Sequence, residues 1–144
     1  MDKVDIKKQT GRGELAEDAL MIRDAVFIAE QGVPEQREHD GEDQNRIHYV
    51  GYLDDKPVTT ARVQVQGDNW HIERVATLSH ARGRGLAQQL MQQIMTDARL
   101  QLARSMDLNA QVTAKPFYDK LGFTQRGDVF LDAGMNHVNM QREL

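Results

Sequence analysis

Cysteine is absent from the 144 residues of this sequence. Disulfide bonds, zinc–thiolate sites and a cysteine nucleophile are therefore excluded at once. This absence does not indicate a compartment, because a chain without thiols tolerates oxidising and reducing conditions alike.

Long apolar runs are also missing, and so is an excess of positive charge. No uninterrupted apolar stretch approaches the ~18 residues that span a bilayer, and residues 1–5 lack the apolar core of a secretory signal. The net charge of −4 argues against general nucleic-acid binding. We therefore expect a cytoplasmic protein with no nucleic-acid and no membrane partner.

The remaining composition is that of one globular domain. Hydrophobic residues make up 40% of the chain and charged residues 28%, a balance typical of folded domains. A chain of 144 residues is long enough for a substantial core. No internal repeat, low-complexity segment or linker is visible, so residues 1–144 are interpreted as a single domain.

Hydrophobic spacing predicts the order of the elements. The expected strands are 3–9, 47–53, 58–65, 70–78, 105–110, 123–131 and 136–141, and the expected helices are 14–31, one that begins at residue 86, and 114–121. The core face of the second helix carries Leu86, Leu90, Ile94 and Leu102. Because that helix separates them, the strands before and after it should be parallel. The pattern predicts an α/β (α+β) fold with a central, mostly antiparallel sheet of six or seven strands, flanked by helices.

The segment 35–46 is acidic and polar. We favour a solvated loop; the alternative is that its carboxylates attract a cationic substrate. Its spacing does not match a calcium-binding EF-hand loop, so we expect no metal there.

A basic, glycine-rich turn lies within residues 75–87, between a predicted strand and a predicted helix. The first N–H groups of a helix lack intrahelical partners, and the helix dipole adds positive charge there. Gly83 and Gly85 allow close backbone approach, and Arg82 and Arg84 add full charges. The turn is therefore predicted to bind the phosphates of a cofactor.

The two commonest phosphate loops do not fit this turn. No Gly-Lys-Ser/Thr ends it, which excludes a Walker loop, and Gln88 stands where a dinucleotide fingerprint has its third glycine. Taken alone, the two glycines are better explained by a plain tight turn.

A second motif lies downstream, with the pattern Ala-x-x-x-Tyr-x-x-x-Gly-Phe from Ala114 to Phe123. Together with the turn 80–85, in this order and separation, it resembles the GNAT superfamily of acetyl-CoA-dependent N-acetyltransferases. The segments 25–34 and 130–138 are similar to its ElaA-like branch.

The resemblance implies a sheet that is splayed where coenzyme A enters. The residues implied to bind the cofactor are Val75, Ala76 and Thr77 along the pantetheine arm, Arg82, Gly83, Arg84, Gly85, Leu86 and Ala87 around the pyrophosphate, and Gln111 before the short helix. Acetyl-CoA is implied as co-substrate, and no metal is implied. His80 and Gln111 depart from the usual Gln or Arg and the usual Asn of the family, but both keep hydrogen-bonding groups.

The same resemblance implies direct attack of a neutral amine on the thioester. The Val75 N–H is the implied donor to the oxyanion, and Tyr118 is the implied proton donor to the leaving thiolate. Tyr118 could instead be a core tyrosine packed against Leu121, but the paired motifs favour function. Glu73 is the implied general base; a carboxylate that simply faces Arg62, Arg74 or solvent is the alternative.

Several other polar residues are weaker candidates. Glu30 and Gln31, at the end of the first helix, and His137 are interpreted as acceptor-binding residues, with ordinary helix-end polarity as the alternative for the first two. His137 and His39 are further base candidates, although a structural histidine is the better interpretation of each. His71 and Glu73 share one strand face, but a zinc deaminase site is excluded because its cysteine pair is absent.

We therefore expect an enzyme that moves an acetyl group from acetyl-CoA to a small-molecule or peptide amine through a ternary complex. The alternative is a non-catalytic acyl-CoA-binding module with the same fold. An exposed final strand could support a homodimer by edge pairing.

Overall fold

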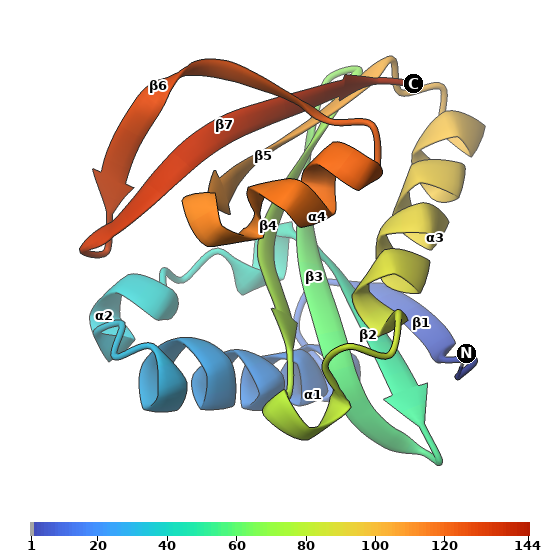
Figure 1. Cartoon of the computed structure of the whole chain (residues 1–144). Helices are drawn as coiled ribbons and strands as arrows, with labels where there is room; N and C mark the ends of the chain where they lie inside the picture. Colours follow the sequence, from blue (N-terminus) through green and yellow to red (C-terminus); the bar gives the residue numbers. More distant parts are fainter. Residues whose placement is uncertain (1) are drawn as a thin grey trace.

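Seven strands form one sheet in the computed structural model, which describes residues 2–144 (Figure 1). The strands are β1 (Asp5–Thr10), β2 (Ile47–Leu53), β3 (Lys56–Gln66), β4 (Asn69–Thr77), β5 (Ser105–Gln111), β6 (Thr124–Asp132) and β7 (Met135–Glu143). The helices are α1 (Glu14–Arg23), a π-helix (Asp24–Glu30), α2 (Glu35–Glu38), α3 (Leu86–Leu100) and α4 (Lys115–Lys120), with 3₁₀ turns at Asp43–Asn45, Ser79–Ala81 and Val112–Ala114.

The strands lie in the order β1-β2-β3-β4-β5-β7-β6. Five of the neighbouring pairs are antiparallel, and β4 and β5 are parallel, joined by α3. The predicted mostly antiparallel sheet, its strand number and the parallel crossover are thus confirmed.

The final strand is not an edge. β7 pairs with β5 on one side and with β6 on the other, so the edges of the described sheet are β1 and β6. The prediction of an exposed final strand is therefore wrong, because a period-two pattern does not reveal strand order. Edge pairing of two chains would have to use β1 or β6 instead.

Helices cover both faces of the sheet. α1 and α3 contact the same strands, β2, β3 and β4, so they must lie on opposite faces. On the α3 face, Leu90 and Ile94 are fully buried together with residues of β2–β5 and α4, as their spacing predicts. On the α1 face, the buried stripe includes Ala19 and Ile22.

Leu102 does not belong to the core, contrary to its predicted place on the helix face. α3 ends at Leu100, and Leu102 follows in a left-handed conformation with φ 63°. The Ala103 N–H donates back to the Ala98 carbonyl, which closes the helix end. The Leu102 side chain is 85% exposed as a result.

The first predicted helix consists of two parts. α1 runs without a break into the π-helix, a wider coil that is often found at functional sites. Gly32 follows with φ 72° and donates its N–H to the Ile28 carbonyl, which agrees with its predicted capping position. Among residues 2–144, no helix is long and apolar enough to cross a membrane.

Alanine substitutions at Leu90 and at Leu102 should differ in their effect on stability, because the first residue is buried on α3 and the second is exposed after its end. We expect Leu90→Ala to lower the free energy of unfolding by about 2–5 kcal/mol, because it leaves a cavity. Leu102→Ala should change it by less than about 0.5 kcal/mol. Urea unfolding followed by circular dichroism measures both, and equal losses would contradict the burial described here.

Candidate active site

The sheet opens between β4 and β5 (Figure 1). The two strands pair from Asn69 opposite Ser105 to Ile72 opposite Leu108, and their pairing stops there. The segment Glu73–Thr77 therefore keeps β3 as its neighbour on one side only. A cavity of about 690 Å³ occupies the opening, lined by both strands, the π-helix, α4 and the β6–β7 turn.

β4 carries a bulge at the start of this opening. Arg62 pairs with Glu73 and Thr60 pairs with Ala76, so Arg74 and Val75 together stand opposite one residue of β3. Arg74 has φ 55°, a left-handed conformation that is uncommon outside glycine. The bulge re-aims the backbone around Val75, the predicted oxyanion donor, which lines the cavity.

The glycine turn leads directly into α3. Gly85 is the N-cap with φ 77°, and no side chain caps the helix; Gly83 is also left-handed, with φ 74°. The first N–H groups of this 15-residue helix therefore remain available to an anion. Arg82 and Ala87 line the same cavity, so the turn and the strand before it form one continuous site whose donors suit a pyrophosphate.

Carboxylates engage both arginines of the turn. The two terminal nitrogens of Arg82 donate to Glu30, each at 2.6 Å, and its Nε donates to the Thr77 carbonyl. Arg84 Nε donates to Asp2 at 2.6 Å. The hydrogen bond from Arg82 lowers the pKa of Glu30 below its ordinary value. Glu30, predicted to bind the acceptor, thus connects the π-helix to the turn.

Tyr118 is both a core residue and a wall of the cavity. Its side chain packs edge-on against Phe117 and Phe123, with ring centroids 5.0 and 6.0 Å away, and the residue is 6% exposed. It lines the cavity, and no side chain or backbone group of residues 2–144 hydrogen-bonds its hydroxyl. Burial raises the pKa of Tyr118, so the phenol keeps its proton at neutral pH.

Glu73 also borders the cavity, but its oxygens are occupied. Oε1 accepts from Arg46 at 2.6 Å and from Arg62 at 3.2 Å, and Oε2 accepts from Arg62 at 3.1 Å. Burial raises the pKa of Glu73, but these two arginines more than offset it and hold the pKa below its ordinary value. This geometry corresponds to the alternative in which the carboxylate faces Arg62.

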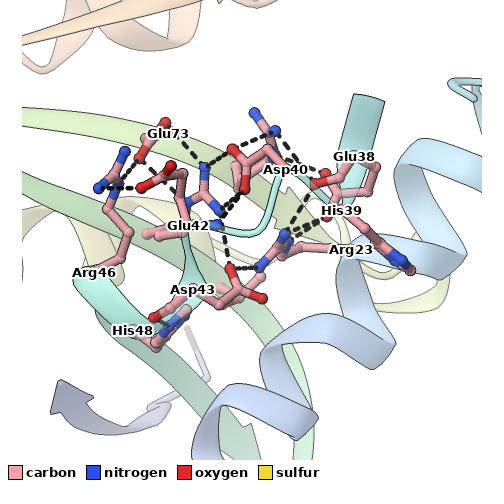
Figure 2. Close-up of polar contacts among 12 residues, drawn as sticks. Arg23, Glu38, His39, Asp40, Glu42, Asp43, Arg46, His48 and Glu73 are labelled. Carbon is pink, nitrogen blue, oxygen red and sulfur yellow. Dashed lines mark hydrogen bonds and ion pairs between the residues drawn. The ribbon is translucent and has the colours of Figure 1, made fainter. Parts of the chain in front are cut away.

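The segment 35–46 is largely exposed, as predicted for a solvated segment, but it is not a simple loop, because it contains α2 and a 3₁₀ turn and buries Glu38. Arg23 and Glu38, 1% and 2% exposed, form an ion pair with a 2.5 Å separation (Figure 2). Asp40 and Asp43 accept from Arg62 at 2.7 and 2.9 Å. These carboxylates are neutralised by arginines, which weakens the alternative that they attract a cationic substrate.

His71 was not predicted as a site residue, yet it lines the cavity. Its Nδ1 lies 2.9 Å from Asp107 Oδ1. The sequence feature that could have indicated His71 as a site residue is its position on the same strand face as Glu73. Asp107 lies on β5, and its position opposite His71 depends on the register of the parallel pair.

Of the remaining predicted site residues, three line the cavity and one does not. Gln31 and Gln111 both line the cavity and share a hydrogen bond of 2.9 Å. His137 lines it too, with Nδ1 2.9 Å from the Met135 carbonyl. His39 pairs with Asp24 at 2.6 Å and is not part of the cavity wall.

A splayed sheet that ends in a basic glycine turn and a helix N-terminus defines the GNAT class of acetyltransferases. The chain belongs to that family: it matches the acetyltransferase (GNAT) domain over residues 8–144. The resemblance drawn from the two motifs is thereby confirmed.

Relatives of known sequence and structure support the ElaA-like branch. The uncharacterized N-acetyltransferase YjcF of Bacillus subtilis is 34% identical over 131 residues, which cover 90% of this chain and 94% of that protein. Protein ElaA of Escherichia coli is 33% identical over 132 residues, covering 87% of this chain and 85% of ElaA. The crystal structure of ElaA matches with a TM-score of 0.87 at 27% identity, covering 98% of this chain and 100% of that chain. An acyl-CoA N-acyltransferase from Pseudomonas aeruginosa matches with a TM-score of 0.85 at 29% identity, covering 97% and 99%.

The ion pair between Glu30 and Arg82 should compete with coenzyme A. We expect Glu30→Gln to tighten coenzyme A binding a few-fold, because Arg82 is then released for the phosphates, and Arg82→Gln to weaken it about tenfold or more. Isothermal calorimetry with coenzyme A measures both. Asp68→Asn, which removes an exposed carboxylate 3.8 Å from Arg104, is the matched control. Weaker binding by Glu30→Gln would contradict the competition.

Proposed function

We propose that this chain transfers the acetyl group of acetyl-CoA to a primary amine by direct attack within a ternary complex. The observation that carries the proposal is the cavity between β4 and β5. This cavity is lined both by the start of α3, whose N-terminus has no side-chain cap, and by Tyr118, which carries a hydroxyl group. Membership of the GNAT family supports it.

The cofactor would lie along the opened strand and the turn. Backbone groups of Val75, Ala76 and Thr77 have no β5 partner and can pair with the amides of a pantetheine arm as a further strand would. The donors assigned to the pyrophosphate are the backbone N–H groups of Arg82, Gly83, Arg84, Gly85, Leu86 and Ala87, together with the guanidinium groups of the two arginines. Gln111, at the end of β5, would contact the arm from the other strand.

Acetyl-CoA supplies an activated acetyl group, and the chain supplies donors for the charge that moves. The Val75 N–H would stabilise the negative charge that develops on the carbonyl oxygen, where one such donor is worth roughly 3–4 kcal/mol. Tyr118 would protonate the departing sulfur. Its burial keeps the phenol neutral until that moment.

The amine would bind in the same cavity, beside the acetyl group. Gln31 and His137 line the cavity, and Glu30 would be released to bind the amine once the phosphates take Arg82. The predicted base Glu73 lies in the same wall, but one of its arginine pairs would have to open before it could accept a proton. We assign the acceptor to primary amines of small molecules or peptides.

Thiol release from acetyl-CoA across a panel of small amines and lysine-containing peptides tests the proposal. Calorimetry with coenzyme A tests the cofactor separately. Binding without thiol release on any amine would favour a non-catalytic acyl-CoA-binding module, and absence of binding at millimolar coenzyme A would overturn both.

Tyr118→Phe should remove the proton donor while the ring remains. We expect thiol release to fall about 10²- to 10⁴-fold, the range of general acid catalysis, with coenzyme A affinity changed less than about twofold. Stopped assays of thiol release and calorimetry measure the two quantities. Phe117→Leu, a change on the same helix that leaves the hydroxyl in place, is the control for packing. Full activity of Tyr118→Phe would exclude the assigned role.

A further inference from the structure

His71 lies at the closed end of the opening between β4 and β5. It pairs in register with Asp107, one position before the last paired residues, Ile72 and Leu108. Ile72 belongs to the core on the α3 face, so His71, its neighbour on the strand, points to the opposite face of the sheet. Its side chain is 18% exposed and lines the cavity.

Asp107 is held in place from three directions. Oδ1 accepts from Asn69 at 2.9 Å and lies 2.9 Å from His71 Nδ1, and Oδ2 accepts from Asn139 at 3.1 Å. Burial raises the pKa of Asp107, but its hydrogen bonds, led by that of His71, bring the pKa to about 2. The group is therefore a carboxylate at neutral pH, and only Nδ1–H of His71 can donate to it.

This contact fixes the tautomer of His71. With the proton on Nδ1, the neutral ring carries its lone pair on Nε2. No hydrogen bond from residues 2–144 occupies Nε2. An imidazole oriented by a buried carboxylate, with its second nitrogen free, is the arrangement that serves as general base in hydrolases.

Glu73, two residues along the same strand, lacks this freedom. Both of its oxygens accept hydrogen bonds from arginines, which stabilise the carboxylate and reduce its affinity for a proton. An aspartate partner stabilises the protonated imidazolium and so increases the affinity of a histidine for a proton. The two neighbours therefore differ in basicity because of their partners.

We propose that His71 is the general base that deprotonates the amine substrate and that Asp107 is its positioning residue. The inference rests on the proposed acetyl transfer and names the residue that the reaction needs on the acceptor side.

The proton balance is complete with groups in the cavity. A proton of the ammonium group passes to His71 Nε2 and leaves a neutral amine. The amine nitrogen then forms a bond to the acetyl carbon, and the carbon–sulfur bond breaks with its electron pair going to sulfur. Tyr118 gives its proton to that sulfur and receives the second proton of the nitrogen, and His71 releases its proton to solvent.

The charged groups around His71 determine whether its pKa is raised or lowered. They are Asp107 on β5, Glu73 on β4 and Arg46 before β2, with Arg126 of β6 3.8 Å behind Asp107. The hydrogen bond to Asp107 outweighs burial and Arg46 and raises the pKa of His71 above its ordinary value. The base form is present above that pKa, so kcat/KM for the amine should rise with pH through it.

The experiment compares ethylamine with 2,2,2-trifluoroethylamine as acceptors in thiol release by the full chain. Ethylamine is an ammonium ion at neutral pH and needs a base, whereas the fluorinated amine is already neutral. We expect His71→Gln to lower kcat/KM for ethylamine about 10²-fold or more and to lower that for trifluoroethylamine less than about fivefold. Calorimetry should show unchanged coenzyme A affinity.

Two further variants sharpen the test. Asp107→Asn should shift the rise of kcat/KM to lower pH, because the charge that raises the pKa of His71 is lost; a merely structural role would leave the profile in place. His39→Gln removes a histidine with a similar aspartate partner outside the cavity wall, and it should change neither rate nor profile.

The outcomes distinguish the two proposals. Equal losses on both amines, or wild-type rates in His71→Gln, would overturn the role of His71 while acetyl transfer stands. Absence of thiol release by the wild type with either amine and across the wider panel would overturn acetyl transfer and this inference together.

Discussion

The early separation of β4 from β5 is the constraint on which the site depends. Buried backbone N–H and C=O groups need partners, yet the segment Glu73–Thr77 has a neighbouring strand on one side only. Its other side presents a row of donors and acceptors to the cavity. An extended ligand arm can satisfy them as an added strand does. The proposed cofactor site therefore depends on the strand before the glycine turn as much as on the turn itself.

A buried ion-pair network holds this strand in its unusual shape. The left-handed conformation of Arg74 costs about 1–3 kcal/mol, and its guanidinium is anchored by Glu38 at 2.7 Å and Asp40 at 3.3 Å. Glu38 in turn pairs with Arg23 at the end of α1. Loss of one partner from such a buried network typically costs about 3–5 kcal/mol, because a charge remains uncompensated. The network thus ties the end of α1 to the bulge.

Local spacing was enough to predict the seven strands, α1, α3, α4, the crossover and the glycine turn, since each depends on neighbouring residues in the chain. It did not predict α2, which lies in a segment interpreted as a loop. The network was not predictable in this way, because its members come from α1, the 35–46 segment, β3 and β4. An acidic segment looks the same in sequence whether water or arginine faces it. Buried arginines at apolar positions, Arg23 in a helix stripe and Arg62 in a strand, were the available signal. The insertion of β7 between β5 and β6 was equally hidden.

The difference between Glu73 and His71 shows why motif position alone does not assign a base. Both residues lie on one face of β4 and border one cavity. Their positions in the strand therefore give no reason to prefer one of them as the base. Their partners separate them: arginines stabilise the charged form of Glu73, and Asp107 stabilises the protonated form of His71. Stabilising a carboxylate weakens a base, whereas stabilising an imidazolium strengthens one. The register of β4 against β5, which brings Asp107 beside His71, therefore supports assignment of the base to His71.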